Sequence, residues 1–256
     1  MWNFFKRKPF LPEADQEFVF ECYHWLLTYF GGDHFYNDVG LVPPTERHFP
    51  TMEGTSEEVA QKTFLRVKRY AQMKKWKCRF KAQEEDPDPG PMVFTDEEKY
   101  SAGGTFSIDK KGRVTITYNP SIVSDPVTMI ATFAHELGHY LTSTAPVPPP
   151  GGWENWEYLT DITAVFMGFG IFQANAAALY INTGLGWRSS NLGYLTEKGY
   201  CYVLAIFILL KGIDPKAVYP HCNTNIKQYL KRAIKELNKS SVIDDLWKVK
   251  YRPYAF

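Results

Sequence analysis

The stretch that most constrains this chain is the helix-forming run from Ala131 to Leu141, which contains the pattern H-E-x-x-H. Its two histidines, His135 and His139, are four residues apart, so on an α-helix both imidazoles project from the same face. That spacing allows two imidazoles to bind one zinc ion, while Glu136 beside them handles a water molecule that the metal activates. We therefore expect the fold to be arranged around this helix.

The residues before the motif are typical of a helix start. Asp125 is the expected N-cap and Pro126 the first helical residue. From there apolar residues recur at three- and four-residue steps, and the histidines fall on the opposite face together with Thr132. We expect the helix to pack on the core through its apolar face and to present His135 and His139 to a cleft. The alternative is a helix whose histidines are merely solvated or satisfied in the core.

A second helix is predicted to supply the third metal ligand. The run from Val147 to Gly152 is rich in proline and glycine, so the chain must turn there. The helical pattern then restarts and places Glu157 and Asp161 four residues apart. We expect Glu157 to complete a site of two histidines and one glutamate, with the fourth position left for water. Asp161 would accept a hydrogen bond from a ligand histidine. Glu154 is a rival third ligand, but it lacks a carboxylate one turn later.

H-E-L-G-H followed by E-Y-L-T-D resembles the gluzincin branch of zinc metallopeptidases, whose pattern is H-E-x-x-H, a gap, and E-x-x-x-D. The resemblance covers roughly residues 120 to 180. It implies that the two histidines and Glu157 bind zinc, that Glu136 is the general base, and that Asp161 supports a ligand histidine.

Two further patterns refine this resemblance. The metzincin branch needs H-E-x-x-H-x-x-G-x-x-H, but here Thr142 and Ala145 stand at the glycine and third-histidine positions. The run T-D, six residues and then G-F-G, from Thr160 to Gly170, is similar to uncharacterised bacterial H-E-x-x-H proteins. No activity follows from that second likeness.

Length and composition are those of one soluble globular domain. The chain has 256 residues, of which 45% are hydrophobic and 22% charged. We predict an α+β, zincin-like fold with a small mixed sheet, an active-site helix pair and further helices. A single domain over residues 1–256 is expected, in which about 1–100 form a helical and mixed part and about 101–256 carry the metal site.

The flanking elements follow from periodicity and turn signals. Helices are expected over Pro12–Phe30, Thr55 to about Lys75, Thr196–Lys211 and about Asn225–Asn238, and strands over Cys78–Gln83, Thr105–Ile108 and Arg113–Tyr118. The last two strands are joined by D-K-K-G, a hairpin signal. In zinc peptidases of the resembled class an edge strand in the place of Arg113–Tyr118 holds the substrate backbone, so strand addition is expected there. A purely structural hairpin is the alternative.

Charge, cysteines and apolar runs indicate the compartment. The net charge of +1 gives no drive toward nucleic acid or an anionic membrane. The four cysteines show no clustered spacing, which favours free thiols in the cytoplasm, with a disulfide as the alternative. The N-terminus has no apolar signal region. Ile162 to Ile181 is long enough to cross a bilayer but carries Gln173 and Asn175, so a buried helix is favoured. Ala164 and Gly168 on it are expected to allow close approach to the histidine helix.

The expected function is that of a metallopeptidase with one Zn²⁺ that hydrolyses peptide or protein substrates. Two alternatives remain open, a zinc hydrolase of a non-peptide bond and a non-catalytic zincin-like module for binding or regulation. Three downstream side chains are able to donate a hydrogen bond to a developing oxyanion. They are Tyr194, Tyr200 and His221.

Overall fold

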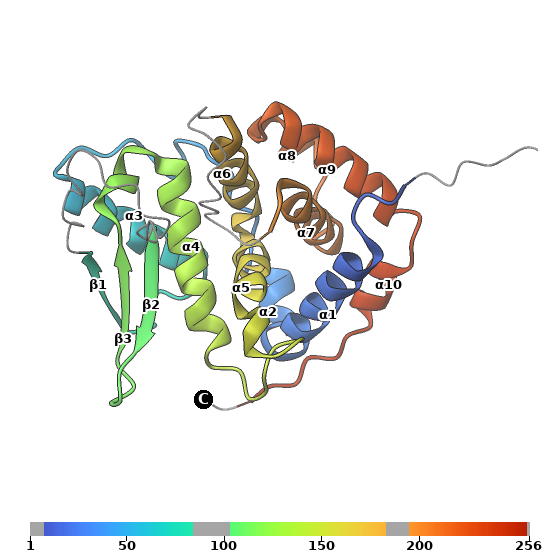
Figure 1. Ribbon diagram of the computed structural model, residues 1–256, viewed down its shortest axis with the longest axis horizontal. Helices are drawn as coiled ribbons and strands as arrows, with labels where there is room; N and C mark the ends of the chain where they lie inside the picture. Colours follow the sequence, from blue (N-terminus) through green and yellow to red (C-terminus); the bar gives the residue numbers. More distant parts are fainter. Residues whose placement is uncertain (1–7, 84–102, 183–194, 255–256) are drawn as a thin grey trace, which may run out of the picture.

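The computed structural model describes residues 8–83, 103–182 and 195–254, with side chains in the second range described to residue 177. The fold is a mixed α and β structure that is mostly helical and carries one small sheet (Figure 1). Its elements are α1 (Glu13–Phe30), α2 (Gly32–Asn37), α3 (Ser56–Tyr70), β1 (Cys78–Ala82), β2 (Gly104–Ile108), β3 (Val114–Tyr118), η1 (Pro120–Ser124), α4 (Pro126–Thr142), η2 (Trp153–Asn155), α5 (Trp156–Ala164), η3 (Val165–Phe169), α6 (Gly170–Asn182), α7 (Glu197–Leu210), α8 (Pro215–Val218), η4 (Tyr219–His221), α9 (Thr224–Leu237) and α10 (Val242–Trp247).

The sheet has the strand order β1-β3-β2, with β1 parallel and β2 antiparallel to β3. In the middle of the register Ile116 of β3 is paired with Phe80 of β1 and with Phe106 of β2. The predicted hairpin is confirmed, but the prediction that its second strand is an edge is wrong. β1, from far upstream, pairs along the other side of β3 and makes it the central strand. The side of β2 away from β3 has no partner strand within the described part of the chain.

Helix α4 stands between the sheet on one side and α5 and α6 on the other (Figure 1). The predicted cap is present, because Asp125 Oδ1 accepts hydrogen bonds from the backbone N–H groups of Val127 and Thr128. The face of α4 that carries the histidines is largely covered, since His139 is only 6% exposed and Thr132 only 3%. The side chain of His135 is 13% exposed and that of Glu157, opposite it, 38%.

The run from α5 through η3 to α6 separates two hydrophobic clusters. One cluster joins it to α1, α2, α7 and α9, and the other joins it to α3, α4 and the sheet. The side chains of this run point toward both clusters. Phe166, for example, packs in the first cluster and Met167 in the second. The first hundred residues contribute to both clusters, because α1 and α3 lie in different ones.

The long helix predicted over Ile162 to Ile181 is interrupted. Gly168 adopts a φ of 98°, which breaks the helix within η3. Its carbonyl accepts a hydrogen bond from Val42 N, and a Cβ atom added to it would lie 2.1 Å from the Gly40 carbonyl oxygen. Within the described residues no helix combines the length and apolar character that a bilayer crossing requires.

Two local predictions on the N-terminal side can be compared with the structure. The capping box of Thr55 and Glu58 is present at the start of α3. The helix ends at Tyr70, earlier than the predicted Lys75, because Gln72 takes a left-handed φ of 60° and Met73 N donates a hydrogen bond to the Lys68 carbonyl.

All four cysteines are free, as expected.

Candidate metal centre

Helices α4 and α5 bring three metal-binding side chains together. One ligand atom each from His135, His139 and Glu157 lies within 4.8 Å of the others. Glu157 Oε2 is 3.2 Å from Nε2 of His135 and also 3.2 Å from Nε2 of His139. In the described part of the chain these three residues form the group that could hold a metal ion, and Glu154 does not belong to it.

The two helices approach closely because α4 carries a glycine at their contact. A Cβ atom on Gly138 would lie 3.1 Å from both Cγ2 and the carbonyl oxygen of Thr160. The expectation that Gly168 serves this approach is wrong, since Gly168 faces Gly40 and Val42 instead. The glycine that matters is thus the fourth residue of the H-E-L-G-H motif itself.

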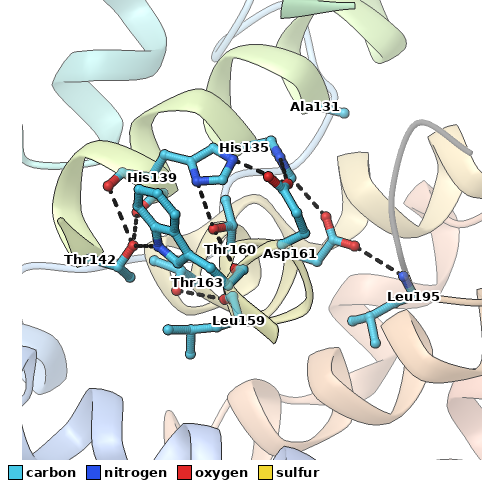
Figure 2. Close-up of polar contacts among 12 residues, drawn as sticks. Ala131, His135, His139, Thr142, Leu159, Thr160, Asp161, Thr163 and Leu195 are labelled. Atoms are coloured by element: carbon cyan, nitrogen blue, oxygen red, sulfur yellow. Dashed lines mark hydrogen bonds and ion pairs between the residues drawn. The ribbon is translucent and has the colours of Figure 1, made fainter. Parts of the chain in front are cut away.

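Asp161 orients the first histidine (Figure 2). Its Oδ1 lies 2.9 Å from His135 Nδ1, as the spacing of the second helix predicted. A carboxylate accepts, so Nδ1 carries the hydrogen and donates, and Nε2 is left to face Glu157. Asp161 is fully buried, and its Oδ2 accepts a hydrogen bond of 3.0 Å from Leu195 N. The Tyr200 hydroxyl also bonds to the Asp161 carboxylate.

Thr160 orients the second histidine, a role that the sequence analysis missed. Its hydroxyl donates to the Trp156 carbonyl at 2.8 Å, so it accepts from His139 Nδ1, which lies 3.1 Å away (Figure 2). Nε2 of His139 is therefore also free to face Glu157. The spacing could have predicted this role, because Thr160 follows Glu157 by three residues and so lies on nearly the same helix face.

With both Nδ1 atoms acting as donors, two imidazole lone pairs and a carboxylate oxygen converge on one point. Such a group of acceptors is stable only around a cation, either a metal ion or a proton. Two imidazole nitrogens and one carboxylate oxygen form a donor set that zinc and related divalent ions accept. The residues present therefore fit a metal ion.

Without a metal, a proton takes this central place. Burial lowers the pKa of His135, but hydrogen bonds to Asp161 and Glu157 outweigh it and raise that pKa to about 10. Burial, together with the neighbouring charge of His135, lowers the pKa of His139. Burial works against ionisation of Glu157, yet hydrogen bonds from both histidines hold its pKa well below the usual range. Besides the two Nδ1 hydrogens, the metal-free group thus holds one additional proton, mainly on Nε2 of His135.

Glu136 lies beside this group on α4. It is only 4% exposed, and its Oε2 has no hydrogen-bond partner among the described residues. Burial raises its pKa, the positive charge of His135 opposes this, and the charge of Glu157 adds to it, with a result of about 7. A carboxyl group that titrates near neutrality can both accept and return a proton.

Aromatic rings surround the His139 side of the group. Phe106 of β2 stacks on the His139 ring at 5.9 Å, and Trp156 meets the same ring edge to face at 4.7 Å. Trp153 packs against Trp156 at 5.2 Å and is 52% exposed. An aromatic surface thus leads from solvent to the metal-binding residues.

Two of the three predicted oxyanion donors lie within the described residues, and neither is among the three side chains that could hold a metal ion. Tyr194 lies outside the described residues. Tyr200 is buried in α7 with its hydroxyl hydrogen-bonded to Asp161. His221 lies in η4, where its carbonyl oxygen accepts from Asn175.

The chain matches no protein-family model, no curated protein and no solved structure. The likeness to gluzincins therefore rests on the motif residues and on the geometry that they adopt.

Proposed function

We propose that the protein is a zinc-dependent metallopeptidase with a zincin-like arrangement of sheet, histidine helix and glutamate helix. The observation that supports it is the convergence of His135 Nε2, His139 Nε2 and Glu157 Oε2, with both Nδ1 atoms tied to acceptors behind them. Bound by these three residues, zinc would polarise the scissile carbonyl and lower the pKa of the attacking water.

In this proposal Glu136 moves the proton. Its carboxylate takes a proton from the attacking water and passes it to the leaving amine. Glu136 is held on the same helix as His135 and His139, so its carboxyl group lies beside the reacting atoms without a separate loop to place it.

Strand β2 is the proposed place for the substrate backbone. Its side away from β3 has no partner strand within the described residues, and the strand runs along α4 with Phe106 on the His139 ring. An extended peptide that pairs with this edge would be bound through its main chain, largely independently of its sequence. This assigns to β2 the role that the sequence analysis had given to β3.

The first test is the metal content of the purified protein and of two variants. Wild type is expected to hold about one zinc per chain. Glu157→Ala should lose the metal, whereas Glu154→Ala, the matched control, should keep it. Wild-type protein that takes up no zinc when zinc is supplied would contradict the proposal.

The second test separates chemistry from binding. The zinc-loaded protein is assayed on a peptide library and on ester and amide substrates, with Glu136→Gln beside it. Peptide cleavage that disappears in Glu136→Gln while the zinc remains supports the mechanism. Cleavage only of the other substrates would assign a hydrolase of a different bond. A zinc-loaded protein without any turnover would indicate a binding module.

A further inference from the structure

Two buried polar atoms beside the metal-binding group are left without a hydrogen bond. Across the part of the chain that the structure describes, the buried side-chain atoms without a partner are Thr132 Oγ1 and Glu136 Oε2. The two residues are 3% and 4% exposed and lie one turn apart on α4. Buried polar groups are usually paired, so two neighbouring exceptions at a candidate active site call for an explanation.

Thr132 differs from the other buried threonines in helices. Each of these has a partner. Four donate to the carbonyl four residues earlier in the same helix, a common local solution: Thr28 to His24, Thr142 to Gly138, Thr160 to Trp156, and Thr163 to Leu159. The other two donate to side chains, Thr128 to Asp125 Oδ2 and Thr63 to Met52 Sδ. The hydroxyl of Thr132 does not use the Thr128 carbonyl in this way. Valine, with the same shape and no hydroxyl, would fill a purely structural position without an unpaired atom.

Gly104 at the start of β2 makes room for both side chains. A Cβ atom there would lie 2.9 Å from Glu136 Oε1 and 2.9 Å from Thr132 Cγ2. Residues four apart on a helix have Cβ atoms about 5–6 Å from each other, so side-chain rotation alone brings a hydroxyl to a carboxylate. The space between α4 and β2 at Gly104 is therefore occupied by the Thr132 methyl group and Glu136 Oε1, and no side chain from Gly104 hinders rotation of either residue.

We propose that Thr132 is a positioning residue for Glu136. In the metal-loaded protein its hydroxyl donates a hydrogen bond to one oxygen of the Glu136 carboxylate, which holds the other oxygen toward the attacking water. This inference rests on the proposed function, in which Glu136 takes the proton. Thr132 itself touches neither the metal nor the substrate.

The test compares Thr132→Val, Thr132→Ser and Thr163→Val as full chains. Thr163 is the matched control, because it is buried on α5 and its hydroxyl bonds only to its own helix. Thr132→Val should keep the zinc affinity and the melting temperature of wild type, while kcat falls about tenfold at unchanged KM. Thr132→Ser should restore kcat. Thr163→Val should lower the melting temperature and keep kcat.

Three results would overturn the inference. They are a wild-type kcat in Thr132→Val, a Thr132→Ser variant as slow as Thr132→Val, and a loss of kcat accompanied by an equal loss of zinc affinity. A crystal structure of the zinc-loaded protein gives a reading that does not depend on turnover. Thr132 Oγ1 within about 3 Å of a Glu136 carboxylate oxygen supports the contact, and clear separation excludes it. Zinc-loaded protein that cleaves nothing would instead refute the proposed function, and the crystal distance would still decide the contact.

Discussion

Asp161 Oδ1 lies 2.9 Å from His135 Nδ1, and through its two carboxylate oxygens Asp161 links two helices to the segment that precedes a third. His135 belongs to α4 and Asp161 to α5, while the other carboxylate oxygen accepts from Leu195 N just before α7. The orientation of one proposed metal ligand therefore depends on a residue that is fully buried and held from a third direction. Metal binding and the packing of α7 are expected to be linked through Asp161.

Replacing Asp161 with asparagine should weaken metal binding. The amide no longer requires His135 to donate from Nδ1, so the Nε2 lone pair is no longer secured toward Glu157. Zinc affinity, measured by competition with a chromophoric chelator, is expected to fall about 10–100-fold. Thr163→Val, two residues after Asp161 and three after Thr160 on α5, should bind zinc as wild type does, because the Thr163 hydroxyl bonds to Leu159 O and not to a histidine. Equal affinities of Asp161→Asn and wild type would refute the role of Asp161.

Zinc binding at pH 8.5 should release the proton of His135, and any proton lost by zinc-bound water would add to it, so at least about one proton per chain is expected. At that pH the metal-free His135, with a pKa raised to about 10, still carries its proton, whereas Glu136, with a pKa of about 7, is already ionised. The metal must displace the His135 proton, so apparent affinity should rise with pH and level off near pH 10. Calorimetry in buffers of different ionisation enthalpy counts the protons. Release of none would show that His135 is neutral in the metal-free protein.

Gly168→Ala should destabilise the fold strongly. The new methyl carbon would clash with the Gly40 carbonyl oxygen, and the backbone of an alanine at a φ of 98° is strained in any surroundings. We expect a loss on the order of 3 kcal/mol in the free energy of unfolding by urea. Gly212→Ala is the control, because Gly212 also has a positive φ of 60° but no atom within 4 Å of its Cβ position. It should cost about 1 kcal/mol. Similar losses in both would show that strain alone, not the contact, governs Gly168.

Trp153→Ala should weaken peptide binding without slowing the chemical step. Its exposed indole continues the aromatic surface that reaches His139 through Trp156. Loss of about 1 kcal/mol of apolar contact corresponds to a rise in KM of about fivefold at unchanged kcat. Trp247 is the control, since it is 51% exposed and stacks on Tyr36 in a contact between α10 and α2. If Trp247→Ala raises KM equally, the aromatic surface is not part of the substrate site.

The spacing of residues along single helices predicted most of the candidate site. The cap at Asp125, the four-residue spacing of His135 and His139, and the same spacing of Glu157 and Asp161 are all properties of single helices. They were readable because an α-helix places such residues on one face wherever it packs. The hairpin of β2 and β3 was also predicted from local sequence, since its turn lies between strands that are adjacent in the chain.

Contacts between distant segments decided the rest. Pairing of β1 with β3 turned the expected edge strand into the central strand. The Gly40 carbonyl packs against Gly168, where the helix is broken. Thr160 hydrogen-bonds to His139 because Gly138 allows α5 to approach α4. The sequence by itself determined which side chains share a helix face, since that depends only on helical periodicity. Only the tertiary structure decided which faces meet, because strand order, left-handed backbone and close approach are set by neighbours far along the chain.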